Sequence, residues 1–474
     1  MRKGEAPRTP ALSRSRPARS GSREAGPSAS RAGGRRMPRD PARPAPPNAS
    51  GAGLHHSAFS IPRFPVTLDA YRELFDLPEG VAYLDHAATG VLSRPAREAA
   101  GAFLDARAGR AFDRGPGSGP GRGGRSPNEY PADLDRVGRA RRRAAALVGA
   151  DVRNVEVVPN TSAGLGLLAA GLDWRPGDRV VVPACEFPAN VLPWRALEDR
   201  GVAVDLVGHR EGTFTAADVE AALRPETRLV AVSWVQFLSG FRCDLAAIGA
   251  LCREHGVLLA VDAIQGVGAL RLDVGAVRPD LVAFGGHKWV CGMQGAGVVV
   301  VADTLLDRLR PAQGWLNGPL DWDDLEGAGL ALHDDATRFR VGTLPMAQVY
   351  ALDAALGLFL DVGPDAIEAA VLDRAGRLAD GLAALGTRRY GAGPGGTDRP
   401  ARGSGIVTVV VDDPEGLHGW LAGRGVLASV RNRLVRFAPH AHTRDADLDR
   451  ALDAVASFGR VAVPSGGGAA TVAS

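Results

Sequence analysis

A lysine and an aspartate in this chain each follow an apolar run, and their side chains could take part in one covalent reaction. Lys288 lies in Gly285-Gly286-His287-Lys288-Trp289, directly after the apolar run 281–284, and Asp262 directly follows the apolar run 257–261. A lysine amine can hold an aldehyde as a Schiff base, and a carboxylate can keep a pyridine nitrogen protonated. The pair therefore predicts a pyridoxal phosphate site with Lys288 and Asp262 as its catalytic residues.

A lysine after an apolar strand is otherwise an ordinary solvated cation, and a single short motif does not separate these two interpretations. The position of both groups favours a catalytic role over that of solvated surface charges. Each follows a run rich in β-branched residues that we expect to be a parallel strand. Open α/β sheets bind ligands along the edge where such strands end.

Seven apolar runs alternate with helical stretches, which predicts an α/β fold with a mostly parallel, doubly wound sheet. The expected strands are 155–158, 179–182, 202–207, 229–232, 257–261, 281–284 and 297–301. After these, residues 347–360 read as a long helix and 406–411 as an edge or antiparallel strand. We expect a large cofactor-binding domain at 91–325 and a smaller α+β domain built from both chain ends, at 59–90 and 326–462.

Two loops could approach a ligand closely. Asn160-Thr161-Ser162-Ala163-Gly164 follows a strand and opens an apolar helix, so its N–H groups and hydroxyls could hold a phosphate, unless it is only a helix N-cap. The small-residue loop 86–90 offers its backbone, and we assign His86 to substrate binding. Residues 115–125, almost all Gly, Pro, Ser and Arg, predict a mobile surface loop or, alternatively, an active-site flap.

Composition excludes several classes of protein. The 474 residues are 45% hydrophobic and 23% charged, as in an ordinary two-domain globular enzyme. The apolar runs are shorter than the roughly 18–20 residues of a membrane span, so we expect no membrane partner. The cysteines show neither CxxC nor Cys/His spacing, so we expect no metal site, no disulfide framework and a cytoplasmic location. They are Cys185, Cys243, Cys252 and Cys291.

The basic charge gathers at the start of the chain. Residues 1–50 hold 12 Lys+Arg and 3 Asp+Glu. The whole chain holds 56 Lys+Arg and 53 Asp+Glu, so the residues after position 50 hold 44 and 50. Such a composition cannot bury enough surface to fold, so we expect a disordered basic tail at 1–58 and a flexible tail at 463–474. The basic tail could be a transit peptide, a nucleic-acid-binding arm or an over-extended translation start, and we favour the last, with Met37 nearer the true start.

Segments 160–164, 262–265, 287–288 and 340–343 together resemble, in order and spacing, the class V aminotransferase superfamily of fold type I enzymes. This group includes cysteine desulfurases, isopenicillin N epimerase and kynureninase. The resemblance covers roughly residues 81–459. It implies a pyridoxal phosphate enzyme in which Lys288 binds the cofactor aldehyde and later moves protons, while Asp262 pairs with the pyridine nitrogen.

The resemblance also implies roles for other residues. Gln265 would contact the ring hydroxyl side, and Arg436 in Val435-Arg436-Phe437 would grip the substrate α-carboxylate, unless it only lines a strand edge. Thr343 would reach the phosphate of a neighbouring subunit, which makes a homodimer the expected state. Further phosphate ligands would be Thr161, Ser162 and His287. The chain departs from the family at Gly285, where relatives often have serine, and at Phe237, near a usual asparagine.

Phe187 stands where many relatives carry a histidine over the cofactor ring, and it can stack there but cannot transfer a proton. Acid-base work would then fall to Lys288. A desulfurase also needs a mobile cysteine, and residues 426–435 contain none. We therefore expect an aminotransferase acting on a small amino acid, with a C–S or β-elimination lyase or an epimerase as alternatives. The rival from another class is a catalytically silent binding or regulatory protein whose tail contacts nucleic acid, a partner that we do not expect.

Overall fold

The computed structural model describes residues 66–108, 130–320, 324, 326, 329–391 and 403–461. The two predicted tails and the Gly-rich loop at 115–125 lie outside these ranges. Within them, the structure contains no helix that combines the length and the apolar character needed to cross a membrane.

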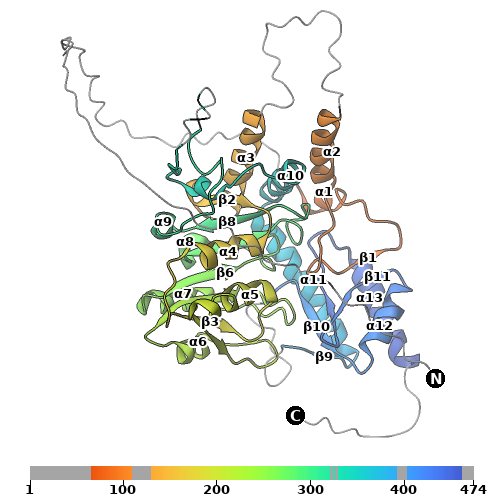
Figure 1. Ribbon diagram of the computed structural model, residues 1–474. Helices are drawn as coiled ribbons and strands as arrows, with labels where there is room; N and C mark the ends of the chain where they lie inside the picture. Colours follow the sequence, from red (N-terminus) through yellow and green to blue (C-terminus); the bar gives the residue numbers. More distant parts are fainter. Residues whose placement is uncertain are drawn as a thin grey trace, which may run out of the picture. The chain divides into compact units, whose positions relative to one another are not determined.

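A seven-stranded sheet forms the centre of the larger part, as predicted (Figure 1). Its order is β2-β8-β7-β6-β5-β3-β4, and β8 is the one strand of this sheet that runs opposite to the other six. All seven predicted strands are present, so the α/β prediction is confirmed. Their bounds are β2 (Val155–Val158), β3 (Arg179–Pro183), β4 (Ala203–Val207), β5 (Thr227–Ser233), β6 (Leu258–Asp262), β7 (Leu281–Gly285) and β8 (Gly297–Val301).

Alternate residues of each strand pack into different apolar clusters, because successive side chains of a strand point to opposite faces. In β5, Val230 and Val232 belong to one cluster, whereas Leu229 and Ala231 belong to the other. The first face is covered by α3 (Tyr130–Val148), α6 (Ala216–Ala222), α7 (Leu245–Glu254), α8 (Val274–Val277) and α10 (Met346–Val362). The second is covered by α4 (Thr161–Gly171), α5 (Leu192–Arg195) and α9 (Asp303–Leu306).

A buried carboxylate joins α10 to α3. Asp353 of α10 is fully buried and accepts hydrogen bonds from three arginines of α3, namely Arg136, Arg139 and Arg143. The nitrogen-to-oxygen distances are 2.7–2.8 Å. Removing the single acceptor would leave three cations around one apolar helix, so this contact fixes the pairing of the two helices. α2 (Arg94–Arg107) packs against the same α10.

The smaller part contains strands from both ends of the described chain. β1 (Ala82–Tyr83) pairs in parallel with β11 (Val426–Leu427). An antiparallel sheet has the order β12-β13-β10-β9, and β10 therefore lies between two neighbours rather than at an edge. Its strands are β9 (Arg388–Arg389), β10 (Val407–Val410), β12 (Ser429–Arg431) and β13 (Leu434–Phe437).

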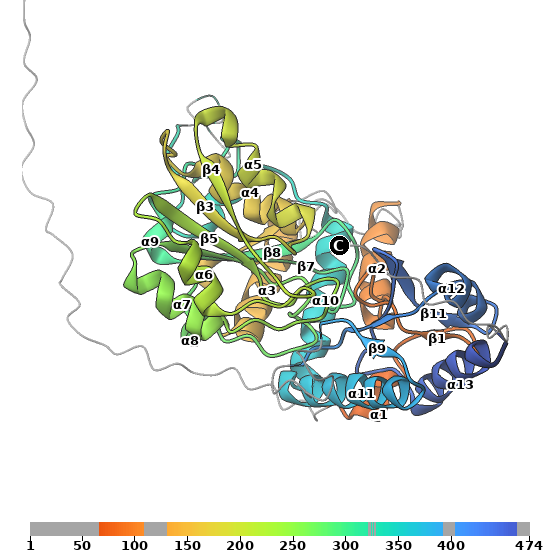
Figure 2. The same ribbon diagram turned by 90° about the horizontal axis from the view of Figure 1, so that it is seen from below.

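Three helices cover these strands in a third apolar cluster, and α11 and α13 lie against each other (Figure 2). They are α11 (Pro364–Ala384), α12 (Pro414–Ala422) and α13 (Asp445–Val461), and the short α1 (Leu68–Arg72) precedes β1. We expected this domain to begin at residue 326. The packing places the boundary later in the chain. The 3-10 turn Ala336–Phe339 and α10 pack in the apolar clusters of the large sheet, and α11 is the first element after them that contributes to the third cluster.

Candidate active site

A cavity of about 450 Å³ opens at the carboxyl ends of β5, β6 and β7. This is the edge at which open α/β sheets bind ligands. The start of α4 and the β12–β13 hairpin complete its walls. Its lining includes the predicted residues Thr161, Ser162, Phe187, Asp262, Gln265, His287, Lys288 and Arg436. It also includes Ala87, Ala88, Thr89, Asn160, Ala189, Ser233, Val235, Phe237, Ile264 and Arg431.

Lys288 and Asp262 face the same cavity from adjacent parallel strands, as expected. Burial raises the pKa of Asp262 to about 6, against the opposing effects of the Ile264 N–H, 3.0 Å from Oδ1, and of the Lys288 charge. Burial also lowers the pKa of Lys288 to about 8, although Asp262 opposes this and Arg436 adds to it. At neutral pH the aspartate is mostly ionised, and a usable fraction of the amine is neutral.

Lys288 stands out further because the chain contains only two lysines, the other being Lys3. All the remaining members of its 56 Lys+Arg are arginines. A guanidinium is always protonated and cannot form a Schiff base, whereas a desolvated lysine amine can. A lysine kept at this one buried position therefore indicates a need for an amine nucleophile rather than for a cation.

The lysine loop, residues 285–292, is held by the two chain-end segments. The N–H of Gly90 donates to the carbonyl of His287 at 2.8 Å, and a Cβ on Gly90 would lie 1.9 Å from the carbonyl oxygen of Lys288. Nε2 of His440 lies 2.9 Å from the carbonyl of Trp289. Since a carbonyl only accepts, His440 donates. Only glycine fits at position 90, and the loop depends on residues before β2 and after β13.

Gln265 lines the cavity, but its amide is largely engaged by the protein. Its Oε1 accepts from Nε1 of Trp289 at 2.9 Å, and its Nε2 donates to the carbonyl of Ala87 at 2.9 Å. One hydrogen of the amide stays available to a ligand. Gln265 thereby connects the lysine loop to the loop at 86–90.

The start of α4 offers a site for an anion. The side chain of Asn160 accepts from the N–H of Ala163 at 2.8 Å, so it is also the N-cap. The hydroxyl of Thr161 is buried in the cavity wall and has no hydrogen-bond partner among the described residues. A Cβ on Gly164 would lie 2.7 Å from that of Ala283, so the helix packs directly on β7. The unpartnered hydroxyl and the helix N-terminus fit a bound phosphate.

Two guanidinium groups enter the cavity from the β12–β13 hairpin. Arg436 is buried and donates to the carbonyl of Phe237 at 2.7 Å and to Asp85 at 3.4 Å, while its Nε has no partner among the described residues. Arg431, which sequence reasoning missed, also lines the cavity. The turn between the strands, residues 432–433, has positive φ angles of 49° and 59°, as a two-residue hairpin requires. That short turn between two apolar runs was the available signal.

Phe187 lies over the amine of Lys288, with its ring centroid 5.8 Å from Nζ. Phe237 meets it edge to face at 5.2 Å. Phe187 and Phe237, two of the departures from the family pattern, are therefore apolar walls of the cavity. The neighbouring Glu186 is buried behind them and accepts from the Ser233 backbone at 2.6 Å and from Gln236 at 2.7 Å. Burial raises the pKa of Glu186 to about 7.

The assignment of His86 to substrate binding is wrong for this conformation. Its side chain is fully buried and does not line the cavity, although Ala87, Ala88 and Thr89 do. The ring contacts the carbonyl of Ala438 and Nε2 of His442 instead. The loop approaches the cavity with its small residues, as expected, while the histidine points to the opposite side.

Thr343 is exposed and lies outside the cavity of its own chain. The preceding Arg340 is buried and forms an ion pair with the fully buried Glu156 of β2, with Nη2 2.8 Å from Oε2. This pair anchors the segment that carries Thr343 to the large sheet.

Comparison with known proteins agrees with this site. Residues 83–418 match the family model described as aminotransferase class-V. The chain is 34% identical over 225 residues to a probable cysteine desulfurase of Methanothermobacter thermautotrophicus, which covers 47% of this chain and 56% of that protein. It is 28% identical over 323 residues to the uncharacterized aminotransferase YcbU of Bacillus subtilis, covering 67% and 82%. The match thus spans little more than half of the length of the first of these relatives.

Solved structures show the same fold. A complex between the cystine C–S lyase C-DES and its reaction product cysteine persulfide has a TM-score of 0.70 at 25% identity, covering 80% of this chain and 98% of that chain. An apo cysteine desulfurase from Thermococcus onnurineus has a TM-score of 0.71 at 22% identity, covering 83% and 98%. The chain belongs to the aminotransferase class-V family of pyridoxal phosphate-dependent enzymes.

The cavity fits the cofactor of this family. The unpartnered Thr161 hydroxyl and the α4 N-terminus suit its phosphate, Asp262 suits its ring nitrogen, and Lys288 suits its aldehyde. Phe187 offers a flat apolar face for the ring.

Proposed function

We propose that this protein is a C–S lyase that eliminates sulfur from a small sulfur-containing amino acid, such as cysteine or cystine. The observation that carries the proposal is the absence of a thiol from the cavity in a chain similar to proteins named for C–S chemistry. All four cysteines lie in described segments, and none of them lines the cavity. The sulfur would therefore leave with the product.

The four thiols are also unsuited to accept sulfur. Cys243, Cys252 and Cys291 are buried, and burial raises the pKa of each thiol well above its usual value. Cys185 lines a separate cavity, and burial together with Glu186 raises its pKa to about 12. Because the thiolate is the nucleophile, all four stay unreactive at neutral pH.

The residues of the cavity suit an elimination. Arg436 and Arg431 both line the cavity, so the guanidinium of Arg436 would bind the substrate α-carboxylate and that of Arg431 would add a second positive charge. The amine of Lys288 takes the Cα proton, since Phe187 cannot. The Cβ–S bond breaks with its electron pair on sulfur, and hydrolysis of the remaining fragment gives pyruvate and ammonia. Pyridoxal phosphate, when bound, supplies the electron sink for the charge at Cα.

Product analysis tests the proposal. The full chain, its Lys288→Ala variant and the control Lys3→Arg would be incubated with cysteine and with cystine, and pyruvate, ammonia and sulfide or persulfide would be measured. We expect equal amounts of pyruvate and ammonia from the wild type and the control, and none from Lys288→Ala. Alanine as the carbon product would instead identify a desulfurase, which contradicts the proposal.

An aminotransferase is the second candidate, because YcbU, which carries that name, matches 67% of this chain. It would yield a keto acid without free ammonia and would require a second keto acid as amino acceptor. Formation of the opposite enantiomer, with neither a keto acid nor ammonia, would identify an epimerase. Adding a keto acid as amino acceptor and measuring the enantiomers extends the assay to all three reactions.

We further propose that the enzyme works as a homodimer in the cytoplasm. An exposed Thr343 outside its own cavity supports this, since a second subunit could use it as a phosphate ligand. A chain that sediments as a monomer at assay concentrations with full activity would contradict the proposal.

A further inference from the structure

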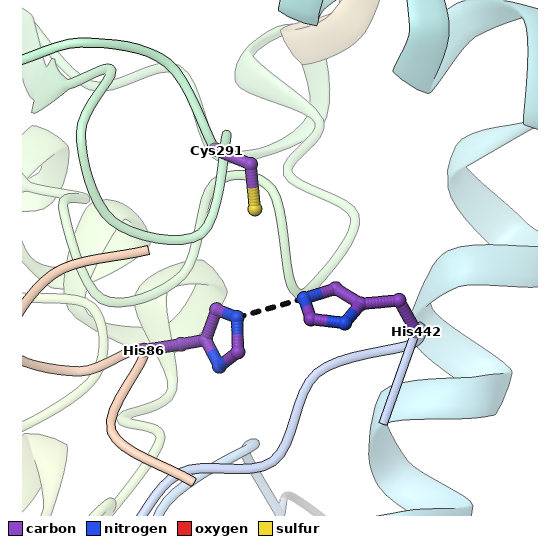
Figure 3. Close-up of side chains that lie close together, drawn as sticks. All are labelled: His86, Cys291 and His442. Carbon is purple, nitrogen blue, oxygen red and sulfur yellow. Dashed lines mark hydrogen bonds between the residues drawn. The ribbon is translucent and has the colours of Figure 1, made fainter. Parts of the chain in front are cut away.

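Three buried side chains with metal-binding atoms meet on the far side of the loop at 86–90, outside the cavity. His86, Cys291 and His442 belong to segments far apart in the sequence, and their ligand atoms all lie within 4.8 Å of one another (Figure 3). All three are almost completely inaccessible to solvent. No spacing motif connects positions 86, 291 and 442, which is why the sequence predicted no metal site.

His86 is oriented as a metal-binding histidine usually is, whereas Nδ1 of His442 has no hydrogen-bond partner among the described residues. Nδ1 of His86 lies 3.1 Å from the carbonyl of Ala438, so this nitrogen carries the hydrogen and Nε2 keeps its lone pair. Metal-binding histidines typically give their other ring N–H to a carbonyl in this way. Nε2 of His442 lies 2.8 Å from Nε2 of His86, and its ring stacks on Phe75 at 3.9 Å.

Cys291 completes a three-sided arrangement. Its Sγ points toward the two rings in Figure 3. The residue has a φ of 57°, a left-handed conformation that is unfavourable for a non-glycine residue. Its hydrogen-bond partner is the carbonyl of Trp289 at 3.7 Å, a weak contact.

A fourth polar atom is available next to the cluster. The hydroxyl of Tyr71 is fully buried and has no hydrogen-bond partner among the described residues. The Tyr71 ring lies close to the cluster, with its centroid 6.4 Å from that of His442. An unpartnered buried hydroxyl is unfavourable, and an ion or its bound water would satisfy it.

We propose that Nε2 of His86, Nε2 of His442 and Sγ of Cys291 bind a zinc ion, with the fourth position on the side of Tyr71. Zn–N bonds of about 2.0–2.1 Å and Zn–S bonds of about 2.3 Å put tetrahedral ligand atoms roughly 3.3–3.6 Å apart. The observed separations, 2.8 Å between the histidines and at most 4.8 Å overall, bracket that value. A closed, buried site with nitrogen and sulfur donors is characteristic of structural zinc.

The ion would join the lysine loop to both chain-end segments. Binding converts the Cys291 thiol to a thiolate and releases one proton to solvent, with no change of oxidation state. The proposal is independent of the reaction catalysed at the cavity, because none of the three ligands lines it.

Metal analysis of the full chain tests the site. Protein produced with zinc in the medium and washed with a chelator would be analysed by mass spectrometry for metals, next to Cys291→Ser, His442→Gln and the matched control Cys252→Ser. Cys252 is equally buried but lies outside the cluster. We expect about one zinc per chain in the wild type and the control, and at least a tenfold loss in the two cluster variants.

Cobalt provides a second readout. Protein grown with cobalt should show visible d–d bands of a four-coordinate ion, at longer wavelengths than pyridoxal phosphate absorbs, and Cys291→Ser should lack them. A wild type without bound metal would overturn the proposal and leave a His86–His442 hydrogen bond alone. Stoichiometric copper or iron would overturn the choice of zinc. The metal content of the wild type tests the zinc site by itself, even if Cys291→Ser fails to fold.

Discussion

The pKa of Lys288 determines how fast it captures an aldehyde, and this rate can be measured. Burial lowers that pKa to about 8, from the ordinary 10.5. An amine attacks an aldehyde only in its neutral form. At pH 7 about one lysine in ten is neutral when the pKa is 8, against about one in 3,000 at the ordinary value. Lys288 should therefore react about 300 times faster than a lysine with an unshifted pKa.

Reductive trapping tests this reasoning. Cofactor-free protein is mixed with pyridoxal phosphate, the adduct is reduced with borohydride at set times, and peptide mapping locates the modified residue. We expect one adduct per chain at Lys288, with a rate that rises with pH up to about 8 and then levels off. Lys3→Arg should behave as the wild type, and Lys288→Arg should lose the adduct. A rate that keeps rising to pH 10, or an adduct at Lys3, would refute the assignment.

Three further predictions address the frame around the site. Gly90→Ala should weaken cofactor binding at least tenfold in a fluorescence titration, because its Cβ would lie 1.9 Å from a lysine-loop carbonyl; Gly101→Ala, with open space at Cβ, should not. Asp353→Asn should lower the free energy of unfolding in urea by about 3–5 kcal/mol, since it strips three arginines of a buried partner. Asp365→Asn, at an exposed pair, should change it by less than about 1 kcal/mol, and equal losses would contradict the network. Burial raises the pKa of Glu186 from 4.5 to about 7, so the folded state binds this proton more tightly and stability should fall as pH rises across that interval. In Glu186→Gln the melting temperature should fall less steeply with rising pH than in the wild type. The same slope in both proteins would exclude Glu186 as the cause of the fall.

The large sheet could be predicted because its strands are short runs of β-branched residues separated by helical stretches. The same runs place Asp262 and Lys288 at neighbouring strand ends, so two groups of the site follow from local pattern alone. The loop at Asn160, expected from its strand–turn–helix sequence to hold a phosphate, lines the same cavity.

Other features depend on contacts between distant segments. Whether His86 or its neighbours face the cavity is decided by Ala438 and His442, more than 350 positions away. The apolar face of α10 is compatible with either domain, and the buried Asp353 that ties it to α3 carries no sequence signal of its own. Arg431 reaches the cavity only because a tight hairpin turns β12 back toward β13.

The hydrogen bonds from Gly90 and His440 to the lysine loop bear on when the protein can become active during its synthesis. Most of the strands of the large sheet emerge from the ribosome long before residue 440 does. Until that histidine has been added and has docked, the carbonyl of Trp289 lacks its donor, and the nucleophile is carried by an incompletely supported loop. Cofactor capture should therefore wait until residue 440 has been synthesised and has docked against the lysine loop.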